Sequence, residues 1–223
     1  MFEEITKQLT SIGGPVLAVL FLISLIATAT SIFKILQFVR IGVGRHAAAN
    51  AALVKWNIGE KKLAYDIAAG NFAPLSRVAA QTMHSLGLAP EHPEIAKEQA
   101  VHVAKEILNK LAGYMRILES VVQAAPMLGL LGTVLGMIDA FGELAKGDGA
   151  VDPSQLAGGI FVALSTTALG LIIAIPFYFI ANWLESRIDA ERVAMEATIS
   201  AILFRTQTEK YTPTQKTGTL IGL

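Results

Sequence analysis

Two uncharged stretches of the chain carry hydroxyl side chains where a plain membrane anchor would carry leucine. One hydroxyl lies within PMLGLLGTVLG and three lie within GGIFVALSTTALGLIIAIP. In an apolar helix, a hydroxyl bonds either to the preceding turn of its own helix or to a polar group of a neighbouring helix. Thr133 and Thr167 lie about equally far from the middle of the intervening segment, so a hairpin brings them to similar depth. We expect a shared polar seam whose candidate lining residues are Thr133, Ser165, Thr166 and Thr167.

Charged side chains are absent from the interior of these stretches. A proton path across a membrane normally needs a titratable group. Asp139 and Glu143 lie one turn apart at the outer end of the first stretch, where we expect them to be solvated. If the chain moves protons, the carboxylate that carries them must therefore come from another chain.

Small residues predict where the helices that carry the hydroxyls pack. Helices in lipid gain no hydrophobic drive toward one another, so small residues mark faces of close approach. The predicted packing residues are Gly129, Gly132, Gly136, Gly159, Ala163 and Gly170. Pro126 and Pro176 each remove a backbone hydrogen bond and are expected to kink their helices.

The composition predicts a membrane protein with three spans. Of the 223 residues, 53% are hydrophobic and 16% are charged. Three apolar runs reach the roughly 20 residues that a spanning helix needs. The first run lacks small-residue spacing and is expected to face lipid, with Lys34 at its inner end extending toward the interface. Zero net charge argues against nucleic-acid binding, and the absence of cysteine excludes disulfides.

Lysine and arginine set the expected orientation. They crowd the segment between the first two runs and the segment after the third. Because such segments stay in the cytoplasm, the N-terminus and the short loop between the second and third runs face outward. The predicted organisation is an outer segment 1–14, a transmembrane helix 15–37, a cytoplasmic helical region 38–119, a transmembrane helix 120–143, an outer loop 144–156, a transmembrane helix 157–184 and a cytoplasmic helical tail 185–223 with a mobile end.

Apolar stripes predict that the second and third spans continue into the cytoplasm as long helices. Between Lys97 and Gln123, apolar residues recur at spacings of three and four without a helix breaker. They are Val101, Ala104, Leu108, Leu111, Met115, Leu118 and Val122. A second stripe consists of Ile188, Met195, Ile199 and Ile202, with Arg187, Glu191, Arg192 and Glu196 around it. The predicted fold class is an all-α membrane protein with three transmembrane helices.

No group of residues predicts catalysis. The four histidines show no metal-ligand spacing and are expected to be solvated or half-buried. The sequence shows no nucleophile paired with a base and no phosphate-binding loop. We therefore predict no enzymatic activity, no metal and no cofactor.

The hydroxyl-bearing stretches resemble the MotA/TolQ/ExbB proton-channel family. The resemblance is carried by LLGTVLGMIDAF (130–141), ALSTTALGLIIAIP (163–176) and NWLE (182–185). The order of the spans matches the three-span ExbB/TolQ branch better than the four-span MotA branch. One position departs, because Val162 stands in GIFVAL where the family usually has the glutamate of a GIAEAL-like stretch. The outer proton access is therefore expected to differ from that of an orthodox ExbB or TolQ.

The resemblance implies a motor subunit of the bacterial inner membrane, whose outer side is the periplasm. Such proteins form homopentameric rings in which the second and third spans line a pore. A pair of ExbD/TolR-like single-span partners supplies the proton-carrying aspartate, and a TonB/TolA-like protein is a further candidate partner. The family's polar threonines correspond to Thr133 and Thr167. Proton flow then drives work on envelope machinery, whose identity stays open, as does the choice between H⁺ and Na⁺.

Two other classes compete with the motor. A stand-alone transporter lacks support from inverted repeats or intramembrane charge. A structural membrane scaffold does not call for glycine-lined spans that carry hydroxyls. Co-purification separates the classes, because a single-span partner with an intramembrane aspartate indicates the motor and a lone active protein indicates the transporter.

Overall fold

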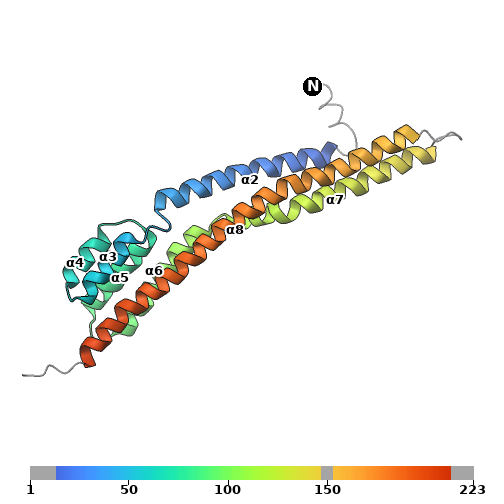
Figure 1. Cartoon of the computed structure of the whole chain (residues 1–223). Coiled ribbons are helices and arrows are strands. Elements are labelled where there is room, and N and C mark those ends of the chain that lie inside the picture. The colour runs from blue at the N-terminus through green and yellow to red at the C-terminus, as the bar shows by residue number, and fades with distance from the viewer. Residues whose placement is uncertain (1–13, 147–152, 212–223) are drawn as a thin grey trace, which may run out of the picture. The chain divides into compact units, whose positions relative to one another are not determined.

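The computed structural model describes residues 14–146 and 153–211, and every regular element among them is a helix (Figure 1). The helices are α2 (Gly14–Ile41), α3 (Ala47–Asn57), α4 (Lys61–Ala69), α5 (Pro74–Leu88), α6 (Pro93–Ala112), α7 (Met115–Lys146) and α8 (Pro153–Tyr211). The predicted all-α class is confirmed. Most of the predicted outer N-terminal segment, the middle of the outer loop and the end of the tail lie outside the described residues.

Three stretches are long and apolar enough to cross a membrane. They lie within Pro15–Ile41, Pro93–Gly142 and Leu156–Arg205, where their most apolar windows have mean hydropathies of 2.5, 1.8 and 2.2. The third belongs to α8, a continuous helix of 59 residues. The prediction that the third span continues as a long helix is confirmed.

The second span is extended differently from the prediction. The helix expected to be its cytoplasmic part, α6, ends at Ala112, and α7 begins at Met115. Tyr114 between them has a φ of 64°, the left-handed conformation in which helices commonly end. Its ring packs edge-on against Phe33 with 5.8 Å between centroids. The expectation of a helix without a break was therefore wrong at Gly113 and Tyr114, where the chain turns.

The chain divides into two compact units, the first of which holds the spans. It comprises α2 as far as Gln37, together with α7 and with α8 as far as Ser186. On α2, Leu20 is fully buried whereas Leu22 is 57% exposed. The first span therefore packs through one face, and the expectation that it simply faces lipid was wrong for that face. Lys34 is also fully buried instead of extending outward, and its Nζ donates to Gln37 Oε1 at 3.0 Å.

The second unit comprises residues 38–111 and α8 from Arg187 onward. Its short helices α3, α4 and α5 contact one another. The indole of Trp56 on α3 is buried, and its Nε1 donates to the carbonyl oxygen of Ile202 on α8 at 3.3 Å. The predicted stripe on α8 is confirmed, since all four of its members are buried: Ile188, Met195, Ile199 and Ile202. Glu191, expected beside the stripe, is buried within it.

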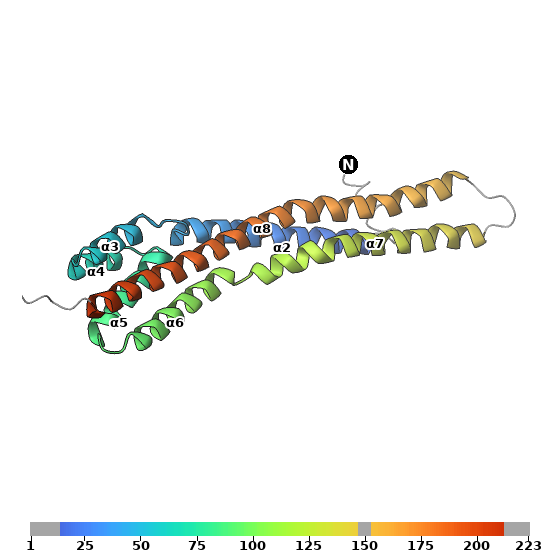
Figure 2. The same ribbon diagram turned by 60° about the horizontal axis from the view of Figure 1, so that its bottom comes forward.

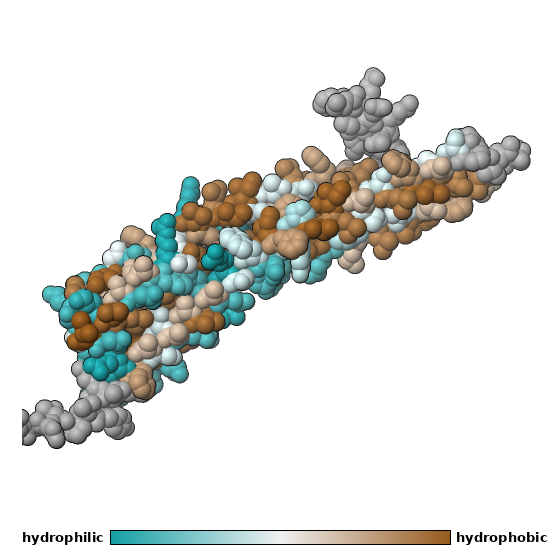
Figure 3. All heavy atoms as spheres, in the orientation of Figure 1, coloured by the Kyte–Doolittle hydropathy of each residue, from teal (hydrophilic) through white to brown (hydrophobic). Residues whose placement is uncertain are grey.

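The surfaces of the two units differ in character. Figure 3 shows hydrophobic residues covering the span part of α8, and hydrophilic residues gathered over the second unit. In the first unit Phe161 is 69% exposed and Ile138 is 63% exposed. A contiguous apolar surface of this kind is suited to lipid or to other helices and not to water.

Candidate functional site

Glycines bring α7 and α8 into close contact within the first unit, where the two helices run side by side (Figure 2). A Cβ atom added at Gly170 would lie 2.5 Å from the carbonyl oxygen of Ala125. A Cβ atom added at Gly129 would lie 2.9 Å from the carbonyl oxygen of Thr166. Cβ atoms do not approach backbone atoms so closely, so this spacing requires glycine at both positions.

The contact continues in antiparallel register, toward the C-terminal end of α7 and the N-terminal end of α8. At each further pair an added Cβ atom would lie within 3.0 Å of the facing side chain: Gly132 with Thr166, Gly136 with Ala163, and Gly159 with Ala140. The register places Thr133 at the level of residues 165–167, as a hairpin requires. The six small residues singled out in the sequence lie along this contact, and their role in a pore stays a prediction.

The carbonyl oxygen of Gly129 is the polar centre of the contact. Thr167 Oγ1 donates to it at 3.0 Å, and Thr166 Oγ1 lies 3.2 Å from it. Thr166 is fully buried and also donates to the carbonyl oxygen of Ala163 in its own helix, at 2.7 Å. Because a hydroxyl has one hydrogen to donate, Thr166 divides it between two acceptors and Thr167 makes the clearer cross-helix bond.

The other two candidate hydroxyls do not join this centre. Thr133 Oγ1 donates to the carbonyl oxygen of Leu130, and Ser165 Oγ donates to that of Phe161, each at 2.7 Å within its own helix. Ser165 is exposed, whereas Thr133 is half-buried in an open groove of about 620 Å³ along α7. The remaining lining of the groove is Val134, Met137, Ile138, Phe141 and Gly142. The proton-pathway role of all four hydroxyls stays a prediction.

The remaining candidates lie within continuous helices. Pro126 and Pro176 lie inside α7 and α8, which both continue through them, and the kinks stay predictions. Val162 and Asp139 are half-buried. The side chain of Glu143 lies outside the described residues.

The contact between α7 and α8 carries no formal charge. The sequence has no Asp, Glu, His, Lys or Arg in 120–138 or in 153–184. Over the described ranges, no group of three or more His, Cys, Asp or Glu side chains is placed to hold a metal ion. Hydroxyl and carbonyl groups can orient a polar partner, but they do not ionise near neutral pH. A proton that passes along this contact therefore needs a carrier that neither helix supplies.

Comparison with known protein families finds a match to more than half of the chain. The sequence model of the MotA/TolQ/ExbB proton channel family matches residues 71–197, more than half of the chain. The chain belongs to this family. The matched range includes α5, α6, α7 and the part of α8 that packs against α7. With its three apolar stretches, the protein is a multi-pass membrane member of the MotA/TolQ/ExbB family.

Relatives named for biopolymer transport are similar to parts of the chain. The biopolymer transport protein ExbB1 of Vibrio cholerae is 40% identical over 88 residues, which cover 40% of this chain and 39% of the relative. A putative ExbB homologue of Methanothermobacter thermautotrophicus is 33% identical over 118 residues, covering 53% of this chain and 40% of the relative. The matches thus span about two fifths of these two relatives. The putative ExbB-like protein 3 of Synechocystis is 26% identical over 171 residues, covering 76% of this chain and 80% of the relative.

Proposed function

We propose that this chain is the ring-forming subunit of a proton-driven motor in the bacterial inner membrane. It acts with a pair of ExbD/TolR-like single-span partners and converts the proton-motive force into mechanical work on envelope machinery. Its N-terminus is periplasmic and its C-terminus cytoplasmic, because the Lys- and Arg-rich segments lie on the cytoplasmic side. The names of the relatives favour biopolymer transport as the process that is driven.

The proposal rests on an uncharged contact between α7 and α8 that contains Thr167, and on Thr133 in the groove along α7, the two positions to which the family resemblance assigns polar threonines. Thr133 uses its hydrogen within its own helix, at 2.7 Å from the Leu130 carbonyl oxygen. The lone pairs of its oxygen can still accept a hydrogen bond from a protonated carboxyl group. An ionised carboxylate cannot make that bond because it has no hydrogen. Thr133, in an open groove on α7, is thus suited to favour the protonated form of a partner's aspartate.

Apolar surface on α7 supports assembly with further helices. Leu130 is 61% exposed and Phe141 is 53% exposed, and both lie on the helix that carries Thr133. Lipid can cover such residues, but it cannot supply a carboxyl group to the groove. A homopentamer around the partner pair, as the family resemblance implies, places helices of both kinds against this surface.

The decisive experiment measures proton flux into liposomes that contain the ring with or without its co-expressed partner. Thr133→Val and Thr167→Val keep the side-chain shape and remove the hydroxyl. We expect each to lower partner-dependent flux about five-fold, because a hydrogen bond between neutral groups is worth about 1 kcal/mol. Native mass spectrometry on the same preparations checks that five copies still assemble.

The matched control is Thr28→Val on α2. Thr28 is exposed, and its hydroxyl donates to the Ser24 carbonyl oxygen of its own helix at 2.8 Å, much as Thr133 bonds to Leu130. This variant should conduct as the wild type does. Strong flux from the chain alone would indicate a stand-alone transporter. Absence of proton flux with the partner present would indicate a structural membrane scaffold. Full proton flux in Thr133→Val and Thr167→Val would overturn the role of the hydroxyls.

A further inference from the structure

The loop that follows α2 forms a defined turn. Gly42 and Gly44 have φ values of 77° and 85°, which glycine adopts at little cost. The N–H of Gly42 donates to the Phe38 carbonyl oxygen at 3.1 Å, and the N–H of Arg45 donates to the Gly42 carbonyl oxygen at 3.1 Å. The turn therefore fixes the direction of the Gly44 N–H and of the ring of His46, the residue that immediately precedes α3.

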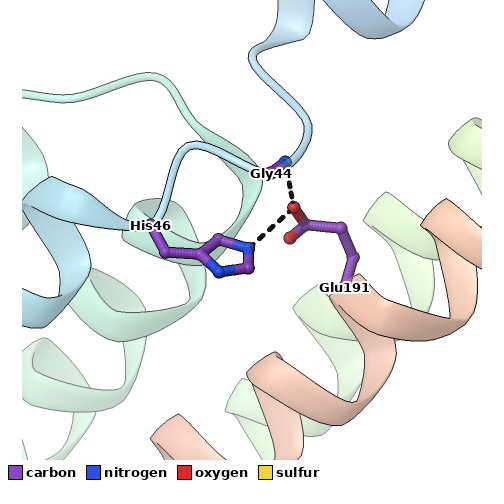
Figure 4. Close-up of polar contacts among 3 residues, drawn as sticks. All are labelled: Gly44, His46 and Glu191. Atoms are coloured by element: carbon purple, nitrogen blue, oxygen red, sulfur yellow. Dashed lines mark hydrogen bonds and ion pairs between the residues drawn. The ribbon is translucent and has the colours of Figure 1, made fainter.

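One buried carboxylate uses both groups (Figure 4). The N–H of Gly44 donates to Glu191 Oε1, and Nε2 of His46 lies 3.0 Å from the same oxygen. A carboxylate oxygen only accepts, so Nε2 carries the hydrogen. His46 immediately precedes α3 and makes no side-chain capping bond to it. Its ring instead bonds to a carboxylate 145 residues away in the sequence.

The two partners differ in their access to solvent. The side chain of Glu191 is 2% exposed and that of His46 is 32% exposed. Oε2 of Glu191 is buried and has no hydrogen-bond partner among the described residues. A buried carboxylate with an unbonded oxygen is unfavourable unless a positive charge lies close to it. Solvent protons reach His46, and a protonated imidazole would supply that charge.

Other charged groups lie on three elements of the second unit. The side chain of Arg45 lies against Gly42 in the loop, and Arg187 on α8 lies close to Gly44. Asp189, Arg192 and Glu196 also lie on α8, and Lys105 on α6 lines a groove with Arg192 and Glu196. Arg192 pairs with Asp189 at 3.3 Å, and Arg187 lies one turn before Glu191. Carboxylate, ammonium and guanidinium groups ordinarily keep their charge between about pH 6 and 8, whereas imidazole changes its charge in that range.

We propose that His46 and Glu191 form a proton-dependent latch. Protonation of His46 turns a neutral hydrogen bond into an ion pair and holds the Gly42–Arg45 turn against α8. Deprotonation leaves neutral donors on Glu191 Oε1, with the guanidinium of Arg187, which lies close to Gly44, as the remaining positive charge, so the turn loosens as the pH rises. The latch belongs to the second unit and does not depend on ion transport. If the proposed function holds, protons released into the cytoplasm protonate His46 and tighten the latch. The loop after α2 then responds to the proton flux.

Hydrogen exchange of the full chain in lipid nanodiscs tests the latch. Protection factors of the segment around Gly44, corrected for intrinsic exchange, are compared at pH 6 and pH 8. Charge-assisted hydrogen bonds are about twice as strong as neutral ones, so we expect wild-type protection to fall about five-fold at the higher pH. His46→Gln keeps a neutral donor that does not titrate and should give the same protection at both pH values. Equal wild-type protection at both values would overturn the proposal.

Two further variants separate the latch from unrelated effects of pH. His92→Gln removes a histidine whose Nδ1 lies 3.1 Å from Glu94 Oε1 on the exposed surface, so the wild-type pH response should remain. Glu191→Gln keeps the shape of the buried side chain and should abolish the response. A response that survives His46→Gln, or that His92→Gln abolishes, would contradict the latch even where Glu191→Gln fails to fold. A chain that conducts no protons would refute the proposed function and leave this result intact.

Discussion

Replacing Gly170 by alanine tests how closely α7 and α8 must approach. Inside an ordinary helix this substitution is favourable by about 0.5–1 kcal/mol, because alanine loses less backbone entropy on folding. Here the new methyl group would lie 2.5 Å from the carbonyl oxygen of Ala125 and 3.2 Å from Cα of Gly129. Both are backbone atoms, so no side-chain rotation relieves the overlap. The helices must separate by roughly 0.8 Å to restore an ordinary C–H···O contact.

The expected cost exceeds the gain in helix propensity. Overpacking costs about 1–3 kcal/mol. Separation also lengthens the bond from Thr167 Oγ1 to the Gly129 carbonyl oxygen, now 3.0 Å, whose loss costs about 1 kcal/mol. After subtraction of the propensity gain, we expect the free energy of unfolding to fall by about 1–3 kcal/mol.

Two glycines on the same helices serve as matched controls. An alanine Cβ at Gly142 on α7 or at Gly158 on α8 would have no atom within 4 Å to meet. Gly142→Ala and Gly158→Ala should therefore match or exceed the wild type in stability. The assay is titration with a denaturing detergent in mixed micelles, followed by circular dichroism, with size exclusion to monitor assembly. A Gly170→Ala variant as stable and as well assembled as the two controls would refute the close-contact reasoning.

Two further substitutions probe the packing of each unit. Leu20→Ala should lower the free energy of unfolding by about 2 kcal/mol, because Leu20 is fully buried. Leu22 is 57% exposed, so Leu22→Ala should change the free energy of unfolding little. Equal effects of the two substitutions in the same detergent titration would contradict the burial of this face. Trp56→Phe removes the donor that bonds to the Ile202 carbonyl oxygen at 3.3 Å and should cost about 1–3 kcal/mol, measured by thermal unfolding of the full chain. No change in stability would show that this bond does not hold α3 to α8.

Sequence patterns predicted the helical elements well where the signal is local. Apolar length alone predicts three spans, because a bilayer of fixed thickness sets the number of residues that must be apolar. The unbroken continuation of α8 was visible in the stripe from Ile188 to Ile202. The break before α7 was missed because Gly113 is a weak signal and Tyr114 rarely takes a left-handed conformation.

The site was predictable only in part. Small-residue spacing indicates a packing face, since its period matches that of a helix. It does not say which hydroxyl faces the neighbouring helix. Turning the helix about its axis by one residue position replaces Thr166 with Ser165 or Thr167 on the facing side. The structure places Thr166 and Thr167 at the Gly129 carbonyl oxygen and leaves Thr133 on a different face.

The sequence by itself determined the number of spans, their expected orientation and the small-residue faces, because apolar length, charge and periodicity are properties of neighbouring residues along the chain. Only the tertiary structure decided that Leu20 faces inward and that Glu191 is buried. The carboxylate of Glu191 bonds to the N–H of Gly44, 147 residues away. Such a pairing depends on how distant helices meet, and a sequence pattern read over one or two helical turns carries no record of it.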